Sequence, residues 1–176
     1  MEREMPFPSR ILGSLSAALV VLAVGSAAFI LEVHGDESPQ AQIAYPAGYR
    51  QWVHVKSAII GSEFPMEPER GIHHVYANPT ALAGFESGTF EDGSVVVYDL
   101  VSLSEKGGVS TEGARRRIDV MVKDSRLYAA TGGWRFGRFM ADDHEHNIMS
   151  PDLHKVCVQC HEKQKAHGFV FSDFRQ

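Results

Sequence analysis

The feature that most constrains this chain is a five-residue motif near its C-terminal end, Cys157-Val158-Gln159-Cys160-His161. Two thiols three residues apart lie on one helical turn and can form thioethers with both vinyl groups of one haem, and the following histidine can bind the iron. The sequence has only two cysteines, which excludes an all-cysteine zinc site within one chain. The motif therefore predicts one covalent haem c per chain, with His161 as the proximal iron ligand.

The motif alone leaves two other interpretations. A Cys-x-x-Cys pair is also the core of thiol redox sites. It also supplies half of a zinc site that His154, His161 or His167 could complete. A hydrophobic segment at the other end of the chain favours haem, because bacterial c-type haem is attached outside the cytoplasm.

That segment is an uncharged run over residues 11–31, between Arg10 and Glu32. As one helix it would span about 31 Å, enough to cross the hydrocarbon core of a membrane. A signal peptide would have its apolar core at residues 11–22 and its cleavage region at residues 25–28. A signal anchor, which the length slightly favours, would stay in place. Both interpretations predict the periplasmic side of the bacterial inner membrane for the rest of the chain, anchored or released.

Composition divides the chain into three expected parts. Residues 1–34 are a signal peptide or anchor, residues 35–46 a linker containing Gly and Pro, and residues 47–176 one haem domain of ordinary size. The formal net charge is −5, so no basic face is implied and nucleic acid is not expected as a partner. An acidic chain favours a redox partner protein with a basic patch.

Short β-like and helical patterns alternate through the haem domain. We expect strands over residues 52–60, 72–77, 94–103, 116–123, 134–140 and 169–174. We expect helices from Asn78-Pro79 to residue 86, from Asp124 or Ser125 to Ala130, and from Ser150-Pro151 through the haem motif, and a loop over residues 105–113. The fold class is α+β: mainly antiparallel β-sheet with short flanking helices and a C-terminal haem-binding helix, preceded by the N-terminal hydrophobic helix.

Several short stretches, in this order and spacing, accompany the C-terminal haem motif. They are Tyr49–Val53, Val75–Pro79, Phe90–Val97, Leu100–Ser102, Val122–Ser125 and Val170–Ser172. From about Tyr49 to Phe174 the chain resembles the family of cytochrome P-460 and its relative cytochrome c′-beta.

The resemblance implies an antiparallel β domain that pairs into a homodimer and holds a five-coordinate c-type haem, with His161 in the proximal place. Cytochrome P-460 oxidises hydroxylamine, and with it nitric oxide, and its haem is bonded to a lysine side chain. Cytochrome c′-beta lacks that bond and binds nitric oxide.

Two positions of the implied distal side are informative. Tyr98 stands where cytochrome P-460 has the lysine, which favours the cytochrome c′-beta branch. Asp119 stands where the hydroxylamine oxidisers have a glutamate, and a carboxylate over iron can accept protons. Alternative interpretations are a packing aromatic for Tyr98, and for Asp119 an ion pair with one arginine of residues 115–117.

The sequence thus predicts an open iron site that binds, and oxidises or detoxifies, nitric oxide or hydroxylamine; whether it is an enzyme stays open. The alternative is a six-coordinate electron-transfer cytochrome in which Met121, Met140 or Met149 is the second axial ligand. His73 and His74 are adjacent on an expected strand, so their rings should point to opposite faces of the sheet.

Overall fold

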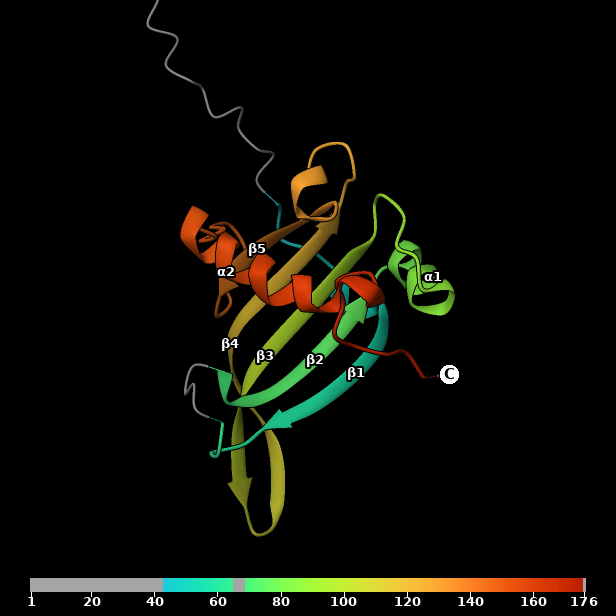
Figure 1. The fold of residues 1–176 in the computed structure, drawn as a ribbon. Coiled ribbons are helices and arrows are strands. Elements are labelled where there is room, and N and C mark those ends of the chain that lie inside the picture. Colours follow the sequence, from blue (N-terminus) through green and yellow to red (C-terminus); the bar gives the residue numbers. More distant parts are fainter. Residues whose placement is uncertain (1–42, 65–68, 176) are drawn as a thin grey trace, which may run out of the picture. The chain divides into compact units, whose positions relative to one another are not determined.

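The computed structural model describes residues 43–64 and 69–175 (Figure 1). Its centre is a five-stranded antiparallel sheet in the order β1-β2-β3-β4-β5. The strands are β1 Val53–Ile60, β2 Gly71–Ala77, β3 Val95–Lys106, β4 Val109–Lys123 and β5 Trp134–Met140, and the helices are α1 Pro79–Ser87 and α2 Pro151–His161. Short 3-10 segments cover Tyr49–Gln51, Ala129–Thr131 and Glu162–His167.

The expected α+β class is confirmed for this part of the chain. The sheet is a meander, because each strand pairs with the next one along the sequence. The hydrophobic run at residues 11–31 lies outside the described residues. Within the described ranges, the structure has no helix that is both long enough and apolar enough to span a bilayer.

Both helices begin as their capping residues predict. Asn78 Oδ1 accepts a hydrogen bond from Ala81 N at 2.8 Å, with proline at the first helical position, and α1 ends at Gly88 in the left-handed conformation. Ser150 Oγ accepts from Leu153 N at 3.2 Å at the start of α2.

Three sequence-based expectations were wrong. Residues 105–113 are not a loop: β3 and β4 continue through them to a two-residue turn at Gly107 and Gly108, both with positive φ, as a tight hairpin requires. The helix expected to run to Ala130 is a turn, in which Asp124 Oδ1 accepts two backbone N–H groups, followed by one 3-10 turn. Residues 169–174 form no strand: the backbone leaves the extended region at Phe169, and the side chains of Phe169, Val170 and Phe174 pack against the hydrophobic core.

The sheet has two faces with different partners. The α2 face, defined here by Val75, Val96, Met121 and Phe136, forms one hydrophobic core against which Cys157 and Val158 of α2 pack. Figure 1 shows α2 crossing this face of the sheet. The outer face forms a second core, made of Ile43, Tyr49, Val97, Ile118, Val120 and Phe139.

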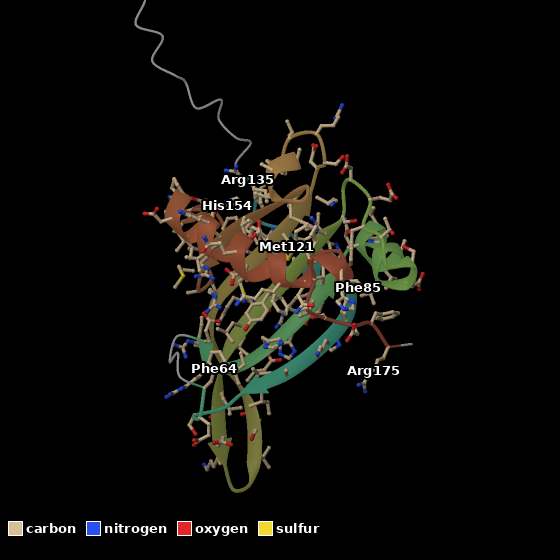
Figure 2. The ribbon with its side chains drawn as sticks, viewed as in Figure 1. Phe64, Phe85, Met121, Arg135, His154 and Arg175 are labelled. Atoms are coloured by element: carbon tan, nitrogen blue, oxygen red, sulfur yellow. The ribbon has the colours of Figure 1, made fainter. Side chains whose placement is uncertain are left out.

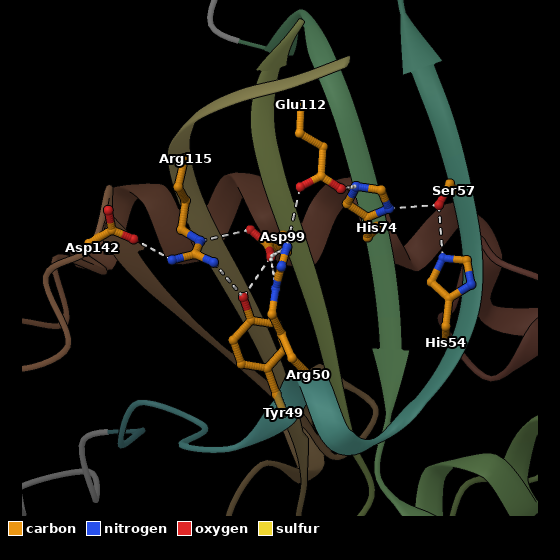
Figure 3. Close-up of polar contacts among 9 residues, drawn as sticks. All are labelled: Tyr49, Arg50, His54, Ser57, His74, Asp99, Glu112, Arg115 and Asp142. Atoms are coloured by element: carbon orange, nitrogen blue, oxygen red, sulfur yellow. Dashed lines mark hydrogen bonds and ion pairs between the residues drawn. The ribbon is translucent and has the colours of Figure 1, made fainter. Parts of the chain in front are cut away.

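A buried carboxylate organises the polar part of the outer face (Figure 3). Asp99 of β3 is fully buried. It accepts hydrogen bonds from Tyr49 Oη at 2.6 Å, Arg50 Nη2 at 3.1 Å and Arg115 Nε at 3.0 Å. These contacts fasten the segment before β1 and the strand β4 to the middle of the sheet.

The same network reaches the surface through a histidine. His74 Nδ1 lies 2.7 Å from Ser57 Oγ, and His74 Nε2 lies 2.8 Å from Glu112 Oε1. Ser57 Oγ also lies 2.8 Å from His54 Nε2. The expectation that His73 and His74 point to opposite faces is confirmed, because His73 stacks on Tyr98 at the α2 face.

Candidate haem site

Helix α2 presents the three residues of the haem motif within one turn. Its N-terminus is fixed by the Ser150 cap, and Cys157 and Cys160 both carry free thiols. Cys157 is half-buried against the α2-face core and Cys160 is exposed. Burial raises the pKa of the Cys157 thiol above its ordinary value.

His161 is oriented by a backbone carbonyl. Its Nδ1 lies 2.7 Å from Phe169 O, so Nδ1 is the donor and Nε2 carries the lone pair. The ring packs between Phe136 and Phe171, with ring centroids 4.8 Å and 5.0 Å away. Burial lowers the pKa of His161, which favours the neutral imidazole that binds metals.

The carbonyl of Phe169 is itself held in place by several contacts. Phe169 has a φ of +67°, and its N–H donates to Gln164 O at 2.8 Å. Trp134, fully buried on β5, donates its indole N–H to Gly168 O at 2.9 Å. The C-terminal segment is therefore fixed to the sheet at the residue that orients His161.

These residues fit a covalently attached haem. A thiol pair one turn apart supplies the two attachment points, and a neutral imidazole with a carbonyl-bonded Nδ1 supplies the axial nitrogen.

Nε2 of His154, three residues before Cys157, is buried without a hydrogen-bond partner in the described structure. Among the described residues, no three His, Cys, Asp or Glu side chains are grouped so that they could hold a metal ion by themselves.

The structure brings the two predicted distal residues together. Tyr98 on β3 and Asp119 on β4 are cross-strand partners, and Asp119 is paired in turn with Arg138 on β5. Partners in adjacent strands project from the same face of a sheet. This row lies on the α2 face, since Tyr98 packs against the core that Cys157 joins.

Asp119 is an ion-paired carboxylate. Its Oδ2 accepts from Arg117 Nε at 2.8 Å and from Arg138 Nη2 at 2.9 Å, and its Oδ1 accepts from Arg138 Nε. Arg117 is almost fully buried and also pairs with Glu69. The pairing with Arg117 is the alternative interpretation of Asp119 given above, whereas the contact with Arg138 follows from the register of β4 and β5, which the sequence did not show.

Tyr98 is a neutral, enclosed phenol. Burial raises its pKa to about 12. Its ring stacks on His73 with centroids 4.6 Å apart and an interplanar angle of 29°, and Arg117 Cζ lies 5.6 Å from its centre. On this face Tyr98 therefore has the packing role and also carries a hydroxyl.

The three methionines considered as iron ligands lie in different surroundings. Met121 is buried in the α2-face core, between α2 and the sheet (Figure 2). Met149 packs against the same core, and Met140 is exposed.

Comparison with known families identifies the chain. The sequence model of the family Cytochrome P460 matches residues 46–172, most of the chain. The chain belongs to the cytochrome P460 family. Its haem motif, α2 and all five strands lie within the matched range. No curated protein sequence matches the chain.

Membership confirms the resemblance and gives the cofactor in general terms. A cytochrome P460 family member is a haem protein with covalently bound haem and iron, and the family is linked to hydroxylamine oxidation. The fit of Cys157, Cys160 and His161 to such a haem comes from the geometry of α2 described above.

Proposed function

We propose that this chain is an exported c-type cytochrome whose iron has one protein ligand and an open distal side for nitric oxide or hydroxylamine. Cys157 and Cys160 form the two thioethers of one haem per chain, and His161 Nε2 is the proximal ligand. The observation that carries the proposal is the contact between His161 Nδ1 and Phe169 O, which leaves Nε2 as the nitrogen of this ring that is free to bind a metal.

The bound haem would supply an iron that binds diatomic and amine ligands and exchanges electrons with them. Tyr98 would donate a hydrogen bond from its neutral phenol, since it stays protonated over the physiological range. Arg117 and Arg138 hold the Asp119 carboxylate, so this side of the site keeps a fixed arrangement of charges. Tyr98 has no amine, which supports a place for this chain in the cytochrome c′-beta branch, whose haem has no bond to a lysine.

The cellular setting belongs to the same proposal. The uncharged run at residues 11–31 supports export to the periplasmic side of the inner membrane. A homodimer and a redox partner with a basic patch are further elements of the proposal, supported by the family resemblance and by the acidic net charge.

The proposal is tested on the purified, fully matured protein. Denaturing mass spectrometry should show the mass of one haem on the chain, and the double variant Cys157→Ala, Cys160→Ala should lose it. His54→Ala is a matched control, because His54 lies in the polar network that includes Asp99 on the outer face. An unmodified chain from a host that matures c-type cytochromes would contradict the attachment.

Coordination is tested by electron paramagnetic resonance of the ferric protein. A mainly high-spin signal, with rapid binding of nitric oxide to the reduced protein, is the expected result. A purely low-spin signal with a methionine-to-iron charge-transfer band would identify the electron-transfer alternative, and Met149→Leu and Met121→Leu would then locate the ligand.

A further inference from the structure

One histidine of the α2 face lies beside the proposed distal residues. His73 of β2 pairs with Leu100 in the register of β2 and β3, two residues from Tyr98 on the same face. Its ring stacks on the Tyr98 ring at 4.6 Å. His73 is therefore diagonal to Tyr98 in the sheet, and its imidazole joins the row of Tyr98, Asp119 and Arg138 through this stacking.

The His73 imidazole has an unused nitrogen. Its Nδ1 is buried and has no hydrogen-bond partner in the described part of the chain. A buried polar atom without a partner costs about 1–3 kcal/mol, so such atoms are rare unless a ligand or water completes them. The next residue, His74, also has a ring nitrogen without a hydrogen bond, Nε2, but the Glu112 carboxylate lies 2.8 Å from that atom on the outer face.

The Asp119 oxygens are already engaged. Both accept hydrogen bonds from arginine side chains. A group that exchanges protons with a bound molecule needs a free lone pair. On this face Nδ1 of His73 has one, in the neutral tautomer that carries its proton on Nε2.

We propose that His73 is the group that accepts a proton from, or hydrogen-bonds to, the molecule bound at the distal side of the haem, beside the Tyr98 hydroxyl, with Asp119 as a positioning residue. The inference rests on the proposed function, since it needs an open distal side. When hydrogen cyanide binds, its C–H proton would move to Nδ1 and the electron pair of that bond would stay on the carbon that binds iron. Hydroxylamine, which binds through a nitrogen lone pair without losing a proton, would instead donate a hydrogen bond to Nδ1.

The surroundings of His73 determine whether its pKa is raised or lowered. Burial lowers its pKa, and the positive charges of nearby side chains lower it further. A neutral ring at pH 7 is therefore the dominant form. The charged and titratable groups that face it are Lys56, Glu69, Tyr98 and Arg117, and His74 acts on it from the other face of the sheet.

The test uses cyanide binding to the ferric, haem-loaded protein, followed by absorption in a stopped-flow instrument. Hydrogen cyanide must lose its proton when it binds, so the association rate reports a distal proton acceptor. In the wild type the rate should fall in acid as His73 becomes protonated, and this should happen at a pH below the ordinary histidine range because the pKa of His73 is lowered. His73→Gln should slow association at pH 7 at least about tenfold and remove this pH dependence.

Two further variants make the result specific. His74→Gln, one residue away on the outer face, should leave the rate and its pH profile unchanged. Asp119→Asn should slow association less than His73→Gln does. Equal rates in His73→Gln and the wild type would overturn the inference, as would a larger loss in Asp119→Asn.

Spectroscopy separates this inference from the proposed function. A wild type that is low-spin and becomes high-spin in His73→Gln would make His73 an iron ligand, which refutes both. A high-spin wild type that binds cyanide with the same rate and pH profile in every variant would refute only the role of His73. Haem mass on each purified variant checks that the substitution did not prevent maturation.

Discussion

Replacing Asp99 with asparagine should lower the free energy of unfolding by about 3–5 kcal/mol, because one partner of a buried charge cluster is removed while the others remain. The carboxylate is fully buried and accepts hydrogen bonds from Tyr49, Arg50 and Arg115. Asparagine keeps one acceptor oxygen, and its NH₂ group would face arginine donors. Arg115 would keep its surface pairing with Asp142 but lose its buried partner.

Two milder variants show how the free energy of unfolding is distributed over this cluster. Tyr49→Phe removes the hydrogen bond from Tyr49 Oη to Asp99, worth about 1.5–3 kcal/mol, and the one that Tyr49 Oη accepts from Arg115 Nη2 at 3.2 Å, but it leaves both arginine pairs of Asp99. Glu112→Gln is the matched control, because Glu112 is about half exposed and lies 3.7 Å from Arg50 and 2.8 Å from His74 Nε2 without contacting the buried carboxylate. An exposed pair of this kind contributes about 1 kcal/mol or less.

Urea denaturation of the haem-loaded protein, followed by far-UV circular dichroism, measures all three variants. The expected order of destabilisation is Asp99→Asn, then Tyr49→Phe, then Glu112→Gln. A loss below about 1 kcal/mol for Asp99→Asn would refute the reasoning, since it would mean that the cluster contributes no more than a surface pair.

The same carboxylate predicts how stability depends on pH. Burial tends to raise the pKa of Asp99, but hydrogen bonds from Tyr49 and Arg115 outweigh it and hold the pKa below its ordinary value. Because the folded protein then binds fewer protons than the unfolded chain, the stabilisation is fully present above about pH 4 and is lost as the pH falls further. Asp99→Asn should flatten this acid limb of the stability curve.

Two other predictions concern the haem side. Gly132→Ala should destabilise the protein by about 1–3 kcal/mol and alter its electron paramagnetic resonance spectrum. Gly132 has a φ of +68°, and an added Cβ would lie 2.2 Å from the ring of Phe169. Gly61→Ala is the control, because the added atom there meets nothing within 4 Å. Tyr98→Phe should leave the reduced Soret band and the mass of the haem peptide unchanged, and a red-shifted wild-type band or a haem fragment that carries the Tyr98 peptide would show a cross-link.

Local signals in the sequence predicted most of the elements. Asn78-Pro79 and Ser150-Pro151 marked the starts of both helices, and the strand expected over residues 134–140 has the bounds of β5. The loop expected at residues 105–113 was wrong because glycine was taken as a breaker of structure. Gly107 and Gly108 instead supply the two positive φ values with which β3 turns directly into β4.

Longer-range features could not be predicted, because they depend on register. The motif identified Cys157, Cys160 and His161 as one unit, and the structure places them on one helix as expected. The contact of Asp119 with Arg138 requires the pairing of β4 with β5. The contact of His161 with Phe169 requires a left-handed backbone at a residue whose aromatic, β-like neighbourhood suggested a strand.

The carbonyl that orients His161 has a consequence for how the cytochrome responds to acidity. Many metal-binding histidines donate their second N–H to a carboxylate, which takes up a proton in acid and then no longer strengthens the imidazole as a ligand. A peptide carbonyl does not titrate in this range. In the proposed haem site, the electron donation from the His161 imidazole would therefore not change with the pH of the surrounding compartment.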